Sequence, residues 1–341
     1  MALKTLRFLL LLCLLLSAFT GYLFLVPYGP QTETFVDIPS GTGTPRIGAL
    51  LEEHHVVRSR YGFDLLRLIK GGRLRAGEYR FDRSAPMTEV YARVVRGDVF
   101  TRTLVIPPGY NIFDIAQAVE QAGLGSRETF LAAERADTSL VQTWNPQALS
   151  LEGFLYPDTY RFSRHSTPET MLGTMVRRWE RAVDQLRPET APGSPDAPGA
   201  GAGRQVNWKQ AMTIASLIER EVAEPSERPL VASVFVNRLR KGMPLQTDPA
   251  VIYAALLTGR YRGTIYASDL QFDSAYNTYR HAGLPPGPIC NPGLASIRAA
   301  LVPAQTDFLY FVSDAAGHSR FASTMQEHSR NVGQYRSAKV P

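Results

Sequence analysis

A single carboxylate interrupts the apolar face of a helix that the sequence predicts in the second half of the chain. Apolar residues recur there at helical spacing and would form one buried stripe: Ala211, Ile214, Ala215, Ile218 and Val222. At about 3.6 residues per turn, Glu221 lies one turn beyond Ile218, within this stripe, whereas Glu219 points well away from it. Because a carboxyl held against an apolar surface loses hydration, its pKa rises. Glu221 could then carry a proton near neutral pH, as a general acid must.

A structural role is the alternative for Glu221, as a carboxylate at the edge of the stripe that pairs with an arginine or reaches water. Further carboxylates could share its chemistry: Glu152, Asp158, Glu227 and Asp248. Asp248 precedes Pro249 and could equally cap a helix expected over 251–257. Ser226 and Glu227 most simply cap the helix that runs to Leu239.

The composition is that of an ordinary globular protein with more than one folded unit. The chain has 341 residues, of which 44% are hydrophobic and 20% charged, so global disorder is excluded. The net charge is +6, but no dense run of Lys and Arg occurs, and nucleic-acid binding is not expected. Cys13 and Cys290 are the only cysteines and lie in unlike segments, which leaves no disulfide framework. The six histidines lack ligand spacing, so neither a metal nor a cofactor is expected.

The N-terminus holds an apolar run long enough to cross a membrane. No charge occurs from Phe8 to Val26, while Lys4 and Arg7 precede the run. The positive-inside rule then predicts a cytoplasmic tail at 1–7, an anchor at 8–28 in the inner (cytoplasmic) membrane, and a periplasmic remainder. A cleaved signal peptide is the alternative, although its apolar region is usually shorter and ends at a small-residue site.

Alternating strand and helix periodicities predict an α+β fold. The expected strands lie at 35–39, 76–81, 101–107, 309–312 and 320–322, and the strand at 309–312 should be buried. The expected helices lie at 45–51, 63–69, 87–95, 111–123, 127–136, 168–186, 251–257 and 295–301. A Pro/Gly-rich stretch at 188–204 cannot build a core and predicts a flexible insertion.

Six motifs follow one another in an order typical of one protein family. They lie at 151–160 (LEGFLYPDTY), 211–222, 231–239, 245–253, 275–279 and 283–293. The ordered set closely resembles the endolytic murein transglycosylase family (YceG-like), and the resemblance covers nearly the whole chain. It implies a small LysM-like α/β subdomain at 33–100, a connecting α/β element at 101–148 and a larger mixed α+β catalytic domain at 149–336. A LysM-like fold is associated with glycan binding.

The resemblance also implies a reaction. The essential glutamate of the family is the second Glu of a Glu-x-Glu pair, which here is Glu221. The enzyme would cleave β-1,4 bonds between MurNAc and GlcNAc in nascent glycan strands, without cofactor or metal. Glu221 would protonate the leaving oxygen and then act as base on the muramic-acid 6-hydroxyl, which closes to a 1,6-anhydro end. By the same resemblance the protein limits strand elongation and works beside peptidoglycan synthases.

Several polar residues are candidates for contact with the glycan. Glu152 is the expected cleft-lining partner, because Gly153 permits close approach and nearby aromatic rings can stack on sugars. Gln246, Asn277 and Tyr279 offer donors and acceptors for sugar hydroxyl and N-acetyl groups, and Asp248 joins them. Structural hydrogen bonding is the alternative for each of these side chains, since buried polar groups are usually paired internally.

Two other functions stay open on the sequence alone. A non-catalytic, membrane-anchored glycan-binding protein would need Glu221 only for structure. A muramidase-type hydrolase would need a second carboxylate as nucleophile or water activator. No second carboxylate stands out as strongly as Glu221, which favours the lyase.

Overall fold

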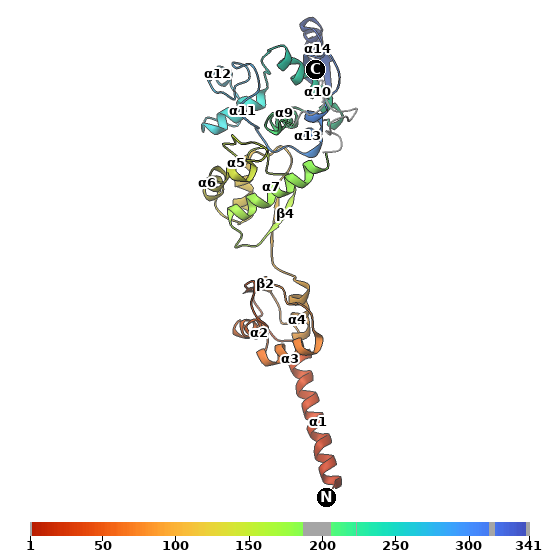
Figure 1. Cartoon of the computed structure of the whole chain (residues 1–341). Helices are drawn as coiled ribbons and strands as arrows, with labels where there is room; N and C mark the ends of the chain where they lie inside the picture. The colour runs from red at the N-terminus through yellow and green to blue at the C-terminus, as the bar shows by residue number, and fades with distance from the viewer. Residues whose placement is uncertain (1, 187–205, 223, 314–317, 339–341) are drawn as a thin grey trace. The chain divides into compact units, whose positions relative to one another are not determined.

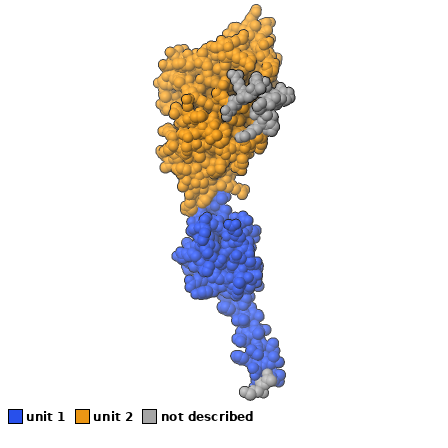
Figure 2. Space-filling model, in the orientation of Figure 1, with its two compact units in different colours: residues 1–102 blue, residues 103–341 orange. Residues whose placement is uncertain are grey.

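The computed structural model describes residues 2–186, 206–222, 224–313 and 318–338. The predicted insertion at 188–204 lies outside these residues. The chain divides into two compact units, Met1–Arg102 and Thr103–Pro341 (Figure 2). Each unit combines helices with short strands, and the sheets of the described residues have two strands each. The fold is therefore mixed α+β, as the sequence predicts.

The first unit begins with a long apolar helix, α1 (Ala2–Leu25) (Figure 1). Its segment Leu3–Leu25 has a mean hydropathy of 2.4 in its most apolar window and is long enough to cross a membrane. Most of its side chains are exposed, but Phe24 near its end is buried in the core of the unit. The helix thus presents an apolar surface along its length and joins the folded part only at its C-terminal end.

The rest of the first unit runs strand, helix, helix, strand, helix. These elements are β1 (Thr34–Ile38), α2 (Thr44–Glu53), α3 (Arg60–Lys70), β2 (Gly77–Phe81) and α4 (Met87–Arg96). The two strands pair antiparallel, with Val36 opposite Tyr79. Ser59 caps α3 by accepting a hydrogen bond from the backbone N–H of Gly62, and the left-handed Gly97 ends α4. Large side chains from all five elements fill one core.

The second unit holds the remaining strands and helices. Its strands are β3 (Arg102–Val105), which pairs with β4 (Thr159–Phe162), and β5 (Tyr310–Ser313), which pairs antiparallel with β6 (Ser319–Ala322). Its first helices are α5 (Ile112–Gln121), α6 (Arg127–Ala136), η1 (Thr138–Val141), α7 (Pro168–Asp184) and α9 (Trp208–Glu221). Its later helices are η2 (Pro225–Glu227), α10 (Arg228–Arg240), α11 (Asp248–Leu257), α12 (Ala267–Leu270), α13 (Leu294–Leu301) and α14 (Met325–Ala338).

Helix α9 packs against three other helices of this unit, α10, α11 and α13. The five residues of the predicted stripe are buried, and so is every other residue from Ala211 to Ile218, because neighbours enclose this helix on all sides. Two hydroxyls are buried with it, and each bonds a carbonyl of its own helix: Thr213 to Lys209 and Ser216 to Thr213. The helix stops at Glu221, since Val222 is extended with φ −110° and ψ 113°. Glu221, its last residue, therefore lies at the end of the buried helix.

The predicted strands and helices are present, and their ends differ from the expected ones by a few residues. The strand at 309–312 is present, but it is less buried than the sequence predicts. Residues Tyr310 to Val312 of β5 are only half-buried, because β6 is its only partner in the sheet and α14 covers it in part. An apolar run alone does not tell a central strand from one at an edge.

Candidate functional site

Glu221 is a half-buried carboxylate without an internal partner. Neither of its oxygens makes a hydrogen bond or an ion pair with another residue that the structure describes. Burial is the largest cause that raises the pKa of this carboxyl, the charge of Asp248 adds to it, and Arg220 opposes both. The pKa rises from an ordinary 4.5 to about 7. Such a group holds its proton in a large share of molecules at neutral pH and can give it to a ligand.

Glu219, two residues earlier, has the opposite character. Its side chain is 7% exposed, although the sequence predicts only that it points away from the stripe. One oxygen lies 3.3 Å from Nη2 of Arg228, and the other accepts the backbone N–H of Gly293 at 2.9 Å. Glu219 therefore ties the end of α9 to the starts of α10 and α13. Of the Glu-x-Glu pair, it is the structural member.

Asp248 is the carboxylate that stands next to Glu221, close enough for its charge to raise the pKa of Glu221. It is the first residue of α11 and is exposed to solvent. Its side chain makes no capping hydrogen bond, so the cap prediction for Asp248 is wrong. Instead Oδ1 accepts a hydrogen bond from the phenol of Tyr279 at 2.6 Å. Burial, this bond, and the charges of Asp248 and Glu221 all raise the pKa of Tyr279, which stays a donor at neutral pH.

Gln246 lies two residues before Asp248 in a left-handed conformation, with φ +55°. Its backbone N–H donates to the carbonyl of Thr278 at 3.1 Å, which joins the segment before α11 to the loop that carries Tyr279. Its exposed side chain accepts a hydrogen bond from Arg238 at 3.4 Å. The strained backbone of Gln246 places its amide on the same loop pair as Asp248 and Tyr279.

Arg238 is a positioning residue that the sequence interpretation did not single out. It is 9% exposed and comes from α10. Its Nε donates to the carbonyl of Leu309 at 2.6 Å, and its Nη1 donates to that of Leu245 at 3.0 Å. The signal in the sequence is an arginine in the largely apolar segment 231–239, and its acceptors are backbone carbonyls that a sequence motif does not reveal.

Asn277 is fully buried and acts inside the loop before Tyr279. Its Nδ2 donates to the carbonyls of Leu270 and Phe272 at 3.0 and 2.7 Å, and its Oδ1 accepts the N–H of Tyr279 at 3.0 Å. All of these bonds shape the chain around Tyr279. Asn277 is thus placed to support the site and not to line a surface that a ligand could reach.

The chain matches the YceG-like family model over residues 36–334. It belongs to the YceG-like family. The endolytic murein transglycosylase of Bacillus subtilis (strain 168) is 33% identical over 325 residues, which cover 91% of this chain and 86% of that protein. That of Streptococcus pneumoniae serotype 2 (strain D39) is 29% identical over 363 residues, which cover 96% of this chain and 64% of that protein. The crystal structure of a YceG-like protein from Listeria monocytogenes superposes with a TM-score of 0.58 at 30% identity, covering 89% of this chain and all of that one.

The family resemblance read from the six motifs is therefore confirmed. The glycine of the motif at 151–160, Gly153, is required by packing. Gly153 has φ +89°, and a Cβ on it would lie 2.5 Å from Cγ of Pro288. The glycine permits a close approach, but its partner is the Pro/Gly-rich loop and not the glycan that the sequence interpretation expects there. A hydrogen bond joins the same two segments: the backbone N–H of Leu155 donates to Oδ1 of Asn291 at 2.9 Å.

Glu152 lies inside this contact and is 3% exposed. Its oxygens accept hydrogen bonds from the backbone N–H of Ile112, the first residue of α5, at 2.9 Å and from Nδ2 of Asn291 at 2.8 Å. Burial is the main cause that raises the pKa of this carboxyl to about 8. The structure places Glu152 beneath the surface with its oxygens occupied, so it serves to hold α5 against the loop and does not stand beside Glu221 as a second acid.

The two remaining candidate carboxylates are bound elsewhere. Asp158 accepts a hydrogen bond from Nε of Arg178 at 2.6 Å. Glu227 accepts the backbone N–H of Ser319 at 3.0 Å; it is the N-cap residue of α10, as predicted, but its side chain makes no capping hydrogen bond. Among the residues that the structure describes, no group of three or more His, Cys, Asp or Glu could hold a metal ion. Glu221 and Asp248 are left as the candidate carboxylates that form no ion pair with another described residue, and the charge of Asp248 acts on Glu221.

Proposed function

We propose that this chain is an endolytic lytic transglycosylase that cleaves MurNAc–GlcNAc β-1,4 bonds in nascent glycan strands and leaves 1,6-anhydroMurNAc ends. The observation that carries the proposal is Glu221, an unpaired carboxyl with a pKa of about 7 at the end of a buried helix. The names of the curated relatives agree with it. Membership in the family and the chemistry of the site thus support the same reaction class.

Glu221 has the two properties that the reaction asks of one residue. As the acid it donates its proton to the glycosidic oxygen while positive charge develops on the sugar. As the resulting carboxylate it accepts the proton of the muramic-acid 6-hydroxyl, which closes on the anomeric carbon without water. A pKa near 7 suits both steps, because donor and acceptor forms are then of similar stability.

Asp248 and Tyr279 are proposed to act on the charge of the bound sugar. Asp248 keeps its carboxylate beside Glu221, where negative charge stabilises an oxocarbenium-like state. Tyr279 holds Asp248 in place through its phenol. Gln246 is proposed to bind a sugar hydroxyl or N-acetyl group, since its side chain is exposed on the same loop pair. Glu152 and Asn277 are proposed to support the site from below.

A muramidase-type hydrolase is the second candidate, and Asp248 is the observation that favours it. A carboxylate next to the acid could form a covalent intermediate or activate water. Digestion of uncrosslinked glycan strands, followed by mass spectrometry of the new termini, separates the two functions. Anhydro ends support the lyase, and reducing ends would establish the hydrolase.

Anchoring and glycan binding by the first unit are part of the same proposal. The helix Leu3–Leu25 would hold the protein in the inner membrane with a cytoplasmic N-terminus, since Lys4 and Arg7 precede the apolar run. The strand–helix–helix–strand order with antiparallel β1 and β2 supports a LysM-like subdomain that binds glycan. An anchored enzyme of this kind would act near the membrane and limit strand elongation beside peptidoglycan synthases.

A further inference from the structure

One face of α3 carries large apolar side chains that are exposed to solvent. They recur at positions i, i+4, i+7 and i+8, and we call them the α3 stripe: Tyr61, Leu65, Leu68 and Ile69. Leu68 is 82% exposed and Tyr61 69%. Another face of the same helix buries Phe63 and Leu66 in the core of the first unit. Contiguous exposed apolar surface of this kind usually marks a binding surface.

The α3 stripe is continuous with the apolar surface of α1. Gly62, next to Tyr61 on the helix, touches α1 so closely that a Cβ there would lie 2.7 Å from Cδ2 of Leu23. Phe24 of α1 enters the core that α3 also lines. Figure 1 shows α3 beside the end of α1 within this unit. A bilayer that surrounds α1 therefore meets α3 at the point where α1 ends.

Aromatic and basic side chains gather at this same level. The guanidinium of Arg58 lies over the ring of Tyr22, 4.5 Å from its centroid, and over that of Tyr28, at 4.7 Å. Its Nη2 also donates to the carbonyl of Pro27 at 3.0 Å, which fixes the chain just after α1. Tyrosines with an apolar ring and a polar tip concentrate at membrane–water interfaces. Their position marks the end of α1 as the interface level.

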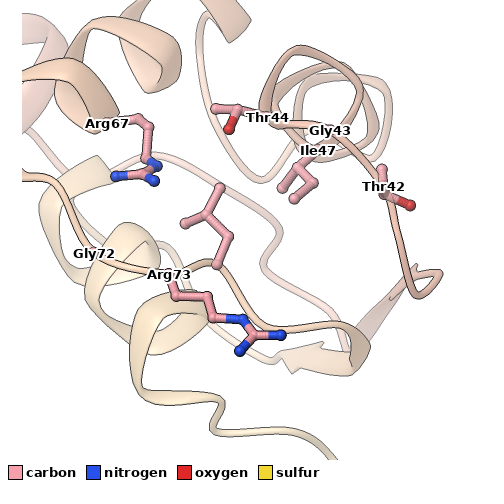
Figure 3. A pocket seen from close by; sticks show the side chains of 8 residues that line it. Thr42, Gly43, Thr44, Ile47, Arg67, Gly72 and Arg73 are labelled. Carbon is pink, nitrogen blue, oxygen red and sulfur yellow. The ribbon is translucent and has the colours of Figure 1, made fainter.

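Cations without an acidic partner lie at the C-terminal end of α3, on other faces of the helix than the α3 stripe. Arg67 and Lys70 lie in the last turn of α3 and Arg73 in the loop after it, and none of them pairs with a carboxylate among the described residues. Figure 3 shows Arg67 and Arg73 at a pocket of about 380 Å³, with Thr44 and Ile47 of α2 on its other side. Lipid phosphates carry the negative charge that could pair with these cations. An apolar stripe on one face of a helix and basic residues on its other faces are the pattern of a helix that lies in a membrane surface.

We propose that α3 lies in the membrane interface beside the end of α1, with the α3 stripe among the acyl chains and Arg67, Lys70 and Arg73 at the lipid phosphates. The first unit is then held to the bilayer at two places, by α1 and by α3. This fixes its orientation to the membrane and not only its distance from it. The inference rests on the proposed anchoring of α1, and the experiment is arranged to separate the two.

The depth of α3 can be measured on the full chain in liposomes. Leu68→Cys in a Cys13→Ser background accepts one environment-sensitive fluorophore, since Cys290 is buried. Val99→Cys is the matched control: an exposed apolar side chain that follows the C-terminal end of α4, whose opposite end, Met87, lies at Gly62 of α3. Quenchers at graded depths along the lipid chains should place the label at position 68 about 5–10 Å below the headgroup boundary. The label at 99 should stay unquenched.

Three results would overturn the inference. Equal quenching at 68 and 99 in protein that stays in the liposomes would reject the interfacial α3 while leaving the anchor intact. Protein that fails to float with the liposomes would reject both. A third outcome is that lipid quenchers have no effect at 68, while the labels quench one another and this self-quenching disappears as the protein is diluted in the bilayer. A second copy of the chain would then be the occupant of the α3 stripe. Depth-dependent quenching that is unchanged on dilution is the result that supports it.

Discussion

Asp248→Asn is expected to move the alkaline limb of the pH–activity profile to lower pH. Glu221 must be protonated to act as acid, so kcat/KM falls as the pH rises through its pKa of about 7. Burial is the larger cause of this raised pKa and the charge of Asp248 the next. Removing that charge should lower the pKa by about 1, since a neighbouring like charge typically contributes on this order.

The expected loss depends on pH, which distinguishes it from general damage to the site. At about pH 7.5, a fall in the pKa from 7 to 6 reduces the protonated fraction of Glu221 roughly eightfold, whereas at about pH 5 the fraction hardly changes. Strand cleavage by the detergent-solubilised full chain, followed across this range, gives the profile. Asparagine keeps an acceptor for the phenol of Tyr279, so the hydrogen bond of 2.6 Å can persist.

Tyr279→Phe is the matched control for this prediction. It removes the hydrogen bond to Asp248 but leaves the charge in place. Its alkaline limb should therefore stay at or above that of the wild type, whatever its absolute rate. An Asp248→Asn limb that coincides with the wild-type limb would refute the reasoning, because the charge of Asp248 would then have no effect on the acid.

Three further substitutions test the supports of the site. Gly153→Ala should destabilise the chain by about 2 kcal/mol or more, because φ is +89° and the new Cβ would meet Pro288 at 2.5 Å; thermal unfolding measures this. Glu219→Gln should cost about 3 kcal/mol, since it leaves Arg228 without its partner in a largely buried ion pair. Glu152→Gln should flatten the pH dependence of stability. Because the pKa of Glu152 rises from 4.5 in the unfolded chain to about 8 in the folded one, its contribution to stability is complete below pH 4.5 and is lost as the pH rises through about 8. Thermal melts between these two pH values measure the slope.

Each of these supports has its own contradictory outcome. A Gly153→Ala chain as stable as the wild type would mean that the Pro288 loop moves aside freely. Unfolding of the Glu219→Gln chain at the wild-type temperature would show that the ion pair with Arg228 contributes nothing. A Glu152→Gln chain that loses stability with rising pH as steeply as the wild type would assign that slope to other groups.

Local pattern was enough to find the helix that carries Glu221 but not its surroundings. The spacing of Ile214 and Ile218 identified the helix and drew attention to Glu221. The same spacing missed the burial of Glu219, because its partners Arg228 and Gly293 come from α10 and from the loop before α13. Periodicity describes one face of a helix, and α9 has neighbours on every face.

Long-range loop contacts explain the other differences. Asp248 was expected as a cap or a ligand contact, and its bond to Tyr279 spans 31 positions along the chain. Asn277 is expected from the sequence to face the glycan, but its side chain donates to backbone carbonyls of its own loop. Every residue has such a carbonyl, so the sequence does not reveal this bond. Gly153 does permit a close approach, but the partner is Pro288 and not a glycan, because the glycine alone reveals its backbone conformation and not what packs on it.

The most direct test of the account compares the two glutamates of the Glu-x-Glu pair. Glu221→Gln and Glu219→Gln are assayed side by side on uncrosslinked glycan strands, at a temperature where both chains are folded. The account predicts that Glu221→Gln loses strand cleavage by about 10²–10⁴-fold while melting close to the wild type, and that Glu219→Gln keeps cleaving despite its lower melting temperature. Wild-type cleavage by Glu221→Gln would contradict the central claim, because another group would then have to supply the acid.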